Sequence, residues 1–484
     1  MKVLNDILFG ENLLEIVGSK DVAISQICFD SRTISSDCLF VAVKGTQTDG
    51  HRYIQQAVEQ GASAIVAEEL PTHLSEKVTY VKVKNSSQSL GLIASNFFGK
   101  PSEKIKIVAV TGTNGKTSIA SLLHQYYQSL GVKVGLLSTI ENKISQKSIT
   151  STHTTPDAIS INSLLNLMVE KGCEYCFMEA SSHAIHQNRV YGLKLSGAIF
   201  TNLSHDHLDY HKTFDEYILA KKALFDYLDD NAFALVNKDD RHAQMMLHHC
   251  SAKPYTYALK SSADFKAKIL ESRFDGTLIN INNHEVWTRL IGEFNIYNLL
   301  AIYSVVTLLG EEQQQALTTV SMLNSAEGRF DLCRSVDGKI GIVDYAHTPD
   351  ALLNVISTIN DIKKSQQLIT VFGCGGDRDK AKRAKMGLIA SKLSEKVIIT
   401  NDNPRSENPD DIIKDILSGV EQNNLKKVLT ITDRKSAIKT ACSLAQEMDI
   451  VLIAGKGHEK YQEINGDRLP FDDKEELINT FNQL

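Results

Sequence analysis

The chain has 484 residues, with 52 lysine or arginine and 58 aspartate or glutamate, so its formal net charge is −6. This balance argues against nucleic acid or an anionic membrane as the main partner. The length suggests about three domains. The start does not resemble a signal peptide and no long apolar run follows, so we expect a cytoplasmic protein without membrane insertion.

The cysteines are few and scattered for a chain of this length. Eight are present, which favours free thiols over a disulfide scaffold. Cys173 and Cys176 form a C-x-x-C pair, but no second pair follows at the spacing of a zinc ribbon. We therefore interpret this segment as a strand leading to Glu179.

Residues 22–100 alternate short apolar strands with helical patterns. Strands are predicted at 38–43 and 64–67, and a helix at 53–60. Pro101 and a charged stretch after it then interrupt the pattern. We expect residues 1–100 to form a small α/β domain.

Residues 108–118, Val-Ala-Val-Thr-Gly-Thr-Asn-Gly-Lys-Thr-Ser, predict a phosphate-binding loop between a buried strand and a helix. Glycines 112 and 115 allow a tight turn whose amide hydrogens converge on phosphate oxygens. Lys116 would reach the β- and γ-phosphates of ATP, and Thr117 would bind Mg²⁺. Val110 stands where the usual pattern has its first glycine, but the apolar strand before the turn and the helical pattern at 119–130 support the prediction.

Polar residues follow two further predicted strands of the central segment. Glu179 ends one, and His207 follows the next, so both could hold Mg²⁺ together with substrate oxygens. Each alone could be a capped surface residue. Histidines 205, 207 and 211 could suggest zinc, but no Cys or Glu lies at the spacing of a zinc enzyme. Lys221 lies on an amphipathic helix, where sequence alone favours a solvated lysine pair with Lys222.

A new series of strands begins after residue 332. Strands are predicted at 340–343, 368–372, 397–400, 428–431 and 450–454. Helical patterns separate them, which is typical of a doubly wound parallel sheet whose ligands lie beyond the strand C-termini. The loops 373–379, 401–407 and 455–459 are the richest in polar residues and glycine. We predict an α/β protein of three domains (1–100, 101–331, 332–484), with a central sheet like that of P-loop ATPases and a C-terminal Rossmann-like sheet.

Five strings occur in an order that resembles the Mur ligase family over nearly the whole chain. They are Thr-Gly-Thr-Asn-Gly-Lys-Thr, Glu-Ala-Ser-Ser-His, His-Leu-Asp-Tyr-His, Asp-Tyr-Ala-His-Thr-Pro at 344–349 and Asp-Asn-Pro-Arg at 402–405. The resemblance implies a UDP-substrate-binding N-terminal domain, a central ATP-binding catalytic domain and a C-terminal amino-acid-binding domain. We also expect a monomer.

The same resemblance implies an ATP-dependent amide-bond ligase of peptidoglycan synthesis. It would add meso-2,6-diaminopimelate to the D-glutamate γ-carboxylate of UDP-N-acetylmuramoyl-L-alanyl-D-glutamate through an acyl phosphate. The Arg405 fork and the Asn403 amide suit the second carboxylate and amine of meso-diaminopimelate, and lysine offers no such carboxylate. L-Lysine stays open as the alternative amine. Rival interpretations are a folylpolyglutamate synthase, which normally lacks the first domain and the Asp-Asn-Pro-Arg string, and a nucleotide switch without ligase activity.

The resemblance also assigns residues to each ligand. Those expected to bind the UDP-substrate are Ser31, Thr46, Gln47, Thr48, Thr154, Thr155, Ser181, Gln187 and Arg189. The ATP site would comprise Gly112, Thr113, Asn114, Gly115, Lys116, Thr117, Ser118, Asn295, Arg329, Asp344 and His347. Diaminopimelate would contact Arg378, Asp402, Asn403, Pro404, Arg405, Gly455 and Glu459. Lys116, Glu179, His207 and Lys221 would be catalytic. Lys221 matches a lysine that CO₂ carbamylates in the family, which would let it join Thr117, Glu179 and His207 as a metal ligand. His153 departs from the asparagine common in relatives and is left out.

Overall fold

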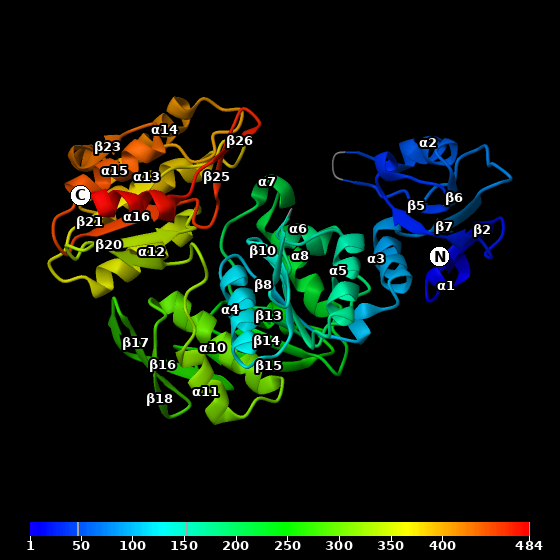
Figure 1. Cartoon of the computed structure of the whole chain (residues 1–484), viewed down its shortest axis with the longest axis horizontal. Helices are drawn as coiled ribbons and strands as arrows, with labels where there is room; N and C mark the ends of the chain where they lie inside the picture. The colour runs from blue at the N-terminus through cyan, green and yellow to red at the C-terminus, as the bar shows by residue number, and fades with distance from the viewer. Residues whose placement is uncertain (46–47, 152, 484) are drawn as a thin grey trace.

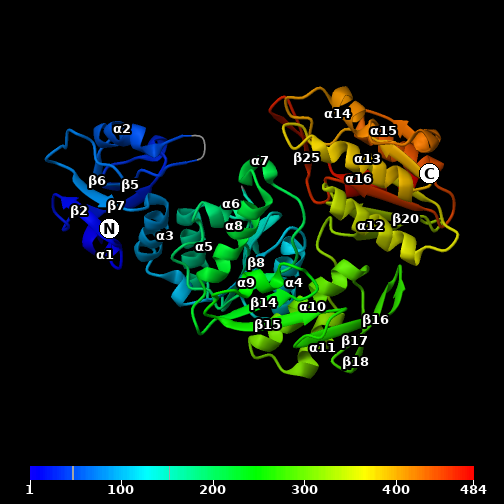
Figure 2. The ribbon, with the colours of Figure 1, turned by 180° about the vertical axis from the view of Figure 1, so that it is seen from behind.

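The computed structural model describes residues 1–45, 48–151 and 153–483. Figure 1 shows three lobes in chain order, with the N-terminus and the C-terminus in the two outer ones. The same separation is visible from behind in Figure 2. The three-domain α/β class predicted from the sequence is confirmed.

The N-terminal lobe is built on a five-stranded sheet of order β2-β7-β6-β5-β4, in which β2 alone runs antiparallel to its neighbour. The predicted elements at 38–43, 53–60 and 64–67 correspond to β5, α2 and β6. The elements are β1 Lys2–Val3, α1 Leu4–Ile7, β2 Leu13–Val17, β3 Ala23–Ile24, β4 Gln26–Cys28, β5 Cys38–Val41, α2 Ile54–Glu59, β6 Ala62–Ala67, β7 Thr79–Val83 and α3 Ser86–Phe97.

The central lobe holds an eleven-stranded sheet of order β11-β10-β9-β12-β8-β13-β14-β15-β16-β17-β18. Strands β9 to β16 in this order are parallel, and antiparallel strands extend both edges. The strands are β8 Lys106–Thr111, β9 Val134–Leu137, β10 Glu141–Ile144, β11 Lys147–Thr150, β12 Tyr175–Glu179, β13 Gly197–Phe200, β14 Phe233–Asn237, β15 Lys253–Ala258, β16 Phe265–Arg273, β17 Gly276–Ile281 and β18 His284–Thr288. The helices are α4 Lys116–Ser129, α5 Ala158–Glu170, α6 Ser182–His186, α7 Leu208–His211, α8 Phe214–Asp226, α9 Ala243–Leu247, α10 Glu293–Leu308 and α11 Gln313–Ser321.

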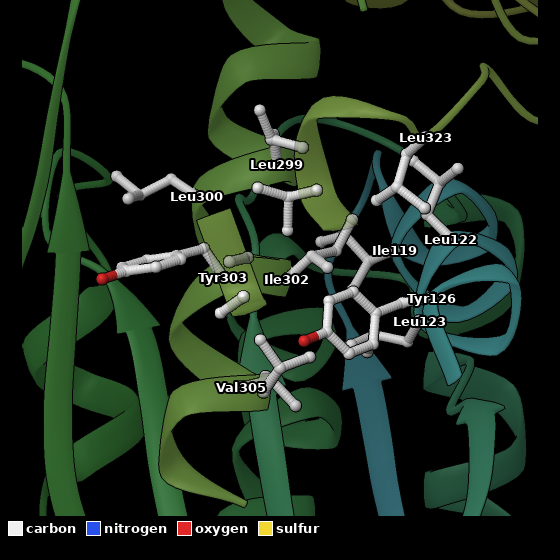
Figure 3. Packing of buried hydrophobic residues seen from close by; sticks show 14 of the residues in the cluster. Ile119, Leu122, Leu123, Tyr126, Leu299, Leu300, Ile302, Tyr303, Val305 and Leu323 are labelled. Carbon is white, nitrogen blue, oxygen red and sulfur yellow. The ribbon is translucent and has the colours of Figure 1, made fainter. Parts of the chain in front are cut away.

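Strand β8 is buried on both faces, as a central parallel strand must be. Val108 and Val110 pack into one hydrophobic cluster, whereas Ile107 and Ala109 pack into the other. On the first face α10 packs against α4, with Leu299 and Ile302 close to Ile119 (Figure 3). The helix that follows the phosphate loop is therefore held by a large apolar core.

The C-terminal lobe is a six-stranded sheet of order β19-β20-β24-β21-β22-β23, parallel except for the edge strand β19. Helices α12, α13 and α14 pack on one face, and α15 and α16 pack on the other, which confirms the doubly wound prediction. The elements are β19 Asp331–Arg334, β20 Ile340–Asp344, α12 Pro349–Ile362, β21 Leu368–Phe372, α13 Ala381–Leu393, β22 Lys396–Ile399, α14 Pro409–Leu417, β23 Val428–Thr430, α15 Arg434–Leu444, β24 Ile450–Ala454, β25 Tyr461–Ile464, β26 Asp467–Pro470 and α16 Asp473–Gln483.

In the part of the chain that the structure describes, no helix combines the length and the apolar character needed to cross a membrane.

Candidate active site

The phosphate loop joins the end of β8 to the start of α4 and depends on two glycines. Gly112 has φ 151° and Gly115 has φ 89°. A Cβ on Gly112 would lie 1.8 Å from Thr201 Oγ1, and one on Gly115 would lie 2.6 Å from Asn298 Oδ1. Both positions therefore exclude a side chain, because the loop backbone lies too close to its neighbours to leave room for one.

The residues after β13 hold the loop in shape. Thr201 Oγ1 donates to Asn114 O at 2.6 Å, and Asn202 Oδ1 accepts from Asn114 N at 3.0 Å. The Thr113 hydroxyl lies 3.1 Å from the hydroxyl of Tyr217, which comes from α8. Ser118 is buried in the first turn of α4. The predicted loop, residues 112 to 118, is thus braced by β13 and α8.

Two lysines converge on one carbonyl of this loop. Lys116 Nζ donates to Gly112 O at 2.9 Å and to Thr113 O at 2.8 Å. Lys221 Nζ donates to the same Gly112 oxygen at 2.7 Å, and only 1% of Lys221 is exposed. Burial, together with the charge of Lys116, lowers the pKa of Lys221 well below its usual value. The sequence-only prediction of a solvated lysine is wrong at Lys221, because α8 turns this position toward the loop.

Thr117 and Glu179 face each other across the ends of β8 and β12. Thr117 Oγ1 donates to Glu179 Oε2 at 2.9 Å, while Glu179 Oε1 accepts from the Thr139 amide at 2.6 Å. Arg329 Nη2 also donates to Thr117 Oγ1, at 3.1 Å. The carboxylate of Glu179 is fully buried and lies beside the first helical turn that would meet phosphates.

His207 lies in the loop after β13 with a left-handed φ of 55°. Its Nε2 is 3.3 Å from Asp206 Oδ2, and its ring lies 4.8 Å from that of His183. Burial is the main cause that lowers the pKa of His207 to about 3, so the imidazole stays neutral at neutral pH, as a metal ligand must.

No preformed metal cage of three His, Cys, Asp or Glu side chains occurs within the described ranges. The zinc alternative gains no support there: the His205 ring stacks on Phe214 with centroids 4.6 Å apart, and His211 Nε2 lies 2.9 Å from Ser182 Oγ. Thr117 and Glu179 offer the hard oxygen donors that Mg²⁺ prefers, and Mg²⁺ commonly completes its shell with water and phosphate oxygens.

The residues expected around the muramoyl-dipeptide form a bonded cluster. Arg189 Nη1 donates to Thr155 O at 2.8 Å, and its Nη2 donates to Gln187 Oε1 at 2.6 Å. The Ser181 amide donates to Thr155 Oγ1 at 3.1 Å. Thr154 joins the same region through a 3.1 Å bond from Thr139 Oγ1. Thr155 Oγ1 in turn donates to Glu179 O at 2.7 Å, so this cluster adjoins the phosphate loop.

The residues expected at the uridine end lie apart, in the N-terminal lobe. Ser31 starts a 3-10 helix, Ser31–Thr33, that the Asp30 side chain caps. Thr48 is exposed, and its carbonyl accepts from the Gly45 amide at 3.0 Å. The predicted positions Thr46 and Gln47 lie outside the described residues.

The nucleotide residues beyond the loop come from α10 and from the start of the C-terminal lobe. Asn295 is buried and donates to Ile291 O at 2.9 Å. Asp344 accepts from the Phe330 amide at 2.7 Å, and burial raises the pKa of its carboxyl to about 6. Burial lowers the pKa of His347 to about 4. Asn114 Nδ2 donates to Asp350 Oδ2 at 3.1 Å, so the start of α12 contacts the phosphate loop directly.

The expected amino-acid residues come from loops after β21, β22 and β24. Arg405 has φ 51°, and its Nη1 donates to Gly376 O at 2.7 Å. Asn403 Nδ2 donates to Glu459 Oε2 at 2.8 Å. The loops pack tightly: a Cβ on Gly376 would lie 1.9 Å from Pro404 O, and one on Gly455 would lie 2.5 Å from Asp402 Oδ2. Arg378 is exposed and lines an open cavity of about 410 Å³ in the same region.

The nucleotide and amino-acid residues meet at Tyr345. The Arg329 guanidinium lies over the Tyr345 ring, 4.4 Å from its centroid. The Tyr345 hydroxyl donates to Glu459 Oε1 at 3.3 Å. Arg329 contacts Thr117 as well, so a chain of direct contacts joins the phosphate loop to the amino-acid loops.

Sequence reasoning missed several residues that shape this site. Tyr217 lies on the helix that was predicted to be amphipathic but was not assigned to the site, and Asp206 beside His207 was not considered. Lys456 lies in the predicted ligand loop 455–459, so its position in the sequence could have indicated that it belongs to the site. Glu463, whose carboxylate accepts from Arg405 Nε at 3.2 Å, lies in a hairpin that no motif indicated.

Comparison with known families gives three matches in chain order. The model described as "Mur ligase family, catalytic domain" matches residues 23–98, "Mur ligase middle domain" matches 110–306, and "Mur ligase, glutamate ligase domain" matches 328–457.

Similar proteins match over the full length. A protein from Phocaeicola vulgatus, named UDP-N-acetylmuramoyl-L-alanyl-D-glutamate--2,6-diaminopimelate ligase, is 51% identical and covers 99% of each chain. One of the same name from Cytophaga hutchinsonii is 49% identical over 99% of each chain. A solved structure of a ligase of this name is 32% identical, covers 100% of this chain and 99% of its own, and has a TM-score of 0.72. These names specify 2,6-diaminopimelate, so they lend no support to the lysine alternative.

Proposed function

Because the chain belongs to the Mur ligase family, we propose that it joins meso-2,6-diaminopimelate to the D-glutamate γ-carboxylate of UDP-N-acetylmuramoyl-L-alanyl-D-glutamate. The reaction converts ATP to ADP and inorganic phosphate. The reaction is a step of peptidoglycan synthesis. One observation carries the proposal: Arg329 contacts Thr117 of the phosphate loop and stacks on Tyr345, which in turn donates to Glu459 of the amino-acid loops. A phosphate site and an amino-acid site that adjoin in this way suit phosphoryl transfer followed by amine attack.

The chemistry follows from the poor electrophilicity of a carboxylate. The γ-carboxylate oxygen attacks the γ-phosphorus of ATP, ADP leaves, and an acyl phosphate forms. The amine then attacks the acyl carbon, an amide bond forms, and inorganic phosphate and a proton are released. Catalysis needs charge neutralisation and positioning rather than an enzyme nucleophile. Lys116, now folded onto the carbonyls of Gly112 and Thr113, supplies a cation at the phosphates.

Thr117, Glu179 and His207 are the residues that would hold Mg²⁺. The hydroxyl of Thr117 and the carboxylate of Glu179 are 2.9 Å apart, and both are buried beside the phosphate loop. When bound, Mg²⁺ supplies positive charge that offsets the charge of the phosphate oxygens. The neutral imidazole of His207 adds no positive charge that would repel the metal ion.

Lys221 would react with CO₂ to form a carbamate. Its buried amine has a lowered pKa and is therefore a nucleophile at neutral pH. The nitrogen of the neutral amine bonds to the carbon of CO₂ and loses one proton, so the side chain becomes an anion; starting from the ammonium form, two protons are released in all. That change removes the repulsion between Lys116 and Lys221 around the Gly112 carbonyl and creates a further oxygen ligand for Mg²⁺.

The remaining ligands divide among the three domains, 1–100, 101–331 and 332–484. The N-terminal domain takes the uridine end of the UDP-substrate through Ser31, Thr46, Gln47 and Thr48. Arg189 pairs with a carboxylate of the muramoyl-dipeptide. The C-terminal domain takes diaminopimelate, with Arg405 binding the second carboxylate. The enzyme works as a monomer in the cytoplasm, where ATP is supplied.

Phosphate release from ATP and Mg²⁺ tests the proposal. The UDP-substrate is supplied with either meso-diaminopimelate or L-lysine, and the product mass is measured. Release and product with meso-diaminopimelate alone are expected. Product with lysine instead would overturn the amine assignment. ATP hydrolysis that ignores the UDP-substrate would favour a nucleotide switch, and absence of turnover with either amine would contradict the proposed reaction.

A further inference from the structure

Lys456 is a fully buried cation among the expected amino-acid contacts. It lies in the loop after β24, and its side chain has 0% exposure. Its Nζ is 3.0 Å from Asn403 Oδ1 and 3.2 Å from Glu459 Oε2. Asn403 and Glu459 are both residues that the proposed function assigns to diaminopimelate, but nothing so far gives Lys456 a role.

Lys456 fixes the orientation of the Asn403 amide. An ammonium has only donors, so the amide must turn its oxygen toward Nζ. The Glu463 amide donates to the same Oδ1 at 3.0 Å, and Asn403 Nδ2 then points at Glu459 Oε2. Nζ also lies 5.5 Å from the centroid of the Tyr461 ring. The Lys456 ammonium and the Glu463 amide therefore fix together which way the Asn403 amide points, and Lys456 also bonds to Glu459, the partner of Asn403 Nδ2.

Lys456 also sets the charge of the subsite. Glu459 and the buried Asp402 bring negative charge to these loops, and Lys456 offsets part of it from inside. The far end of meso-diaminopimelate carries both an ammonium and a carboxylate, whereas the far end of L-lysine carries an ammonium alone. A subsite with surplus negative charge would attract the lysine cation and repel the diaminopimelate carboxylate.

We propose that Lys456 is a positioning residue that determines the choice of amine, because it holds Asn403 and Glu459 in place and keeps the subsite close to neutral. This inference rests on the proposed function.

The test compares Lys456→Gln with Lys456→Met. Glutamine keeps a hydrogen-bond donor and removes the charge, while methionine removes both. Lys460→Met is the matched control, because Lys460 lies four residues along, has a side chain 64% exposed and pairs with Glu327 at 3.0 Å. For each variant kcat and KM are measured for meso-diaminopimelate, L-lysine, ATP and the UDP-substrate, and folding is checked by circular dichroism.

In both Lys456 variants, kcat/KM for meso-diaminopimelate is expected to fall about tenfold or more, mainly through KM. The preference for meso-diaminopimelate over lysine should shrink by a similar factor, with KM for ATP and the UDP-substrate unchanged. Lys460→Met should match the unaltered protein.

An unchanged preference between the two amines would overturn the inference, as would a parallel rise of KM for ATP. Failure of both variants to fold would assign Lys456 a structural role and overturn it too. Absence of turnover in the unaltered protein would instead contradict the proposed function, so the two failures are distinguishable.

Discussion

The nucleotide end and the amino-acid end of the candidate site are built differently. At the nucleotide end, consecutive residues between β8 and α4 form a loop, and Lys116 together with Lys221 from α8 bonds to the carbonyls of that loop. At the amino-acid end, three loops and the β25–β26 hairpin meet, and bonds from side chains as well as backbone groups hold them together. Asn403, Glu459 and Lys456 all bond to one another in this way.

This difference predicts that substitutions at the two ends have different effects on turnover. In the proposed mechanism the nucleotide end activates the carboxylate before any amine is used, so a substitution there should stop turnover whichever amine is supplied. The amino-acid end acts only in the proposed second step, so a substitution there should change amine use and leave ATP binding in place. Variants at each end test this distinction.

The largest effect is expected from Lys221→Met. Loss of the proposed carbamate should lower kcat by about 10²- to 10³-fold with either amine, because a charge that would stabilise phosphoryl transfer is lost. Lys222→Met is the matched control: Lys222 is the next residue on α8 and pairs with Asp226 near the surface. Native mass spectrometry should find one added CO₂ in the unaltered protein and none in Lys221→Met. A native mass without CO₂ would contradict the carbamate, and full activity of Lys221→Met would contradict the role of this residue.

Much of the fold was predictable because buried parallel strands leave a strong local pattern. Residues 368–372 and 450–454 are predicted at the same bounds as β21 and β24. The antiparallel hairpin of β17 and β18 and the edge strand β19 were missed. Edge strands are half exposed and carry weaker apolar patterns, and their pairing depends on distant partners.

The candidate site was predictable where one short segment makes it. The phosphate loop is contiguous, and its glycine spacing follows from the backbone it must adopt. The burial of Lys221 could not be predicted from the sequence. An amphipathic pattern does not indicate which residue of a helix faces a loop more than a hundred positions earlier in the chain. Glu463 gave no signal for a similar reason: it reaches Arg405 only because β25 pairs beside the loop after β22.

A smaller and more selective effect is expected from Arg405→Ala. kcat/KM for meso-diaminopimelate should fall about 100-fold, because the distal carboxylate loses a charged donor fork. Binding of ATP should persist. Arg405→Lys keeps the charge without the fork and should recover only part of the loss. Unchanged steady-state kinetics in Arg405→Ala would contradict the assignment, and weakened ATP binding would break the distinction between the two ends.

The last effect concerns stability rather than turnover, near the nucleotide end. His124 lies buried in α4, 3.3 Å from Ser145 O, and burial lowers its pKa from 6.5 to about 4. The unfolded chain therefore binds more protons between these two values, so the free energy of unfolding falls as pH drops through this window. The loss should reach about 3 kcal/mol by pH 4.

His124→Gln cannot titrate, so denaturant unfolding measured from pH 7 to pH 4 should show a shallower decline than in the unaltered protein. His284→Gln, at an exposed position in β18, is the control and should leave the decline as it was. Since α4 carries the phosphate loop, acid should release bound ATP at the same pH at which this helix loses its support. An identical decline in His124→Gln would mean that other groups cause the acid sensitivity, and that α4 is not where it begins.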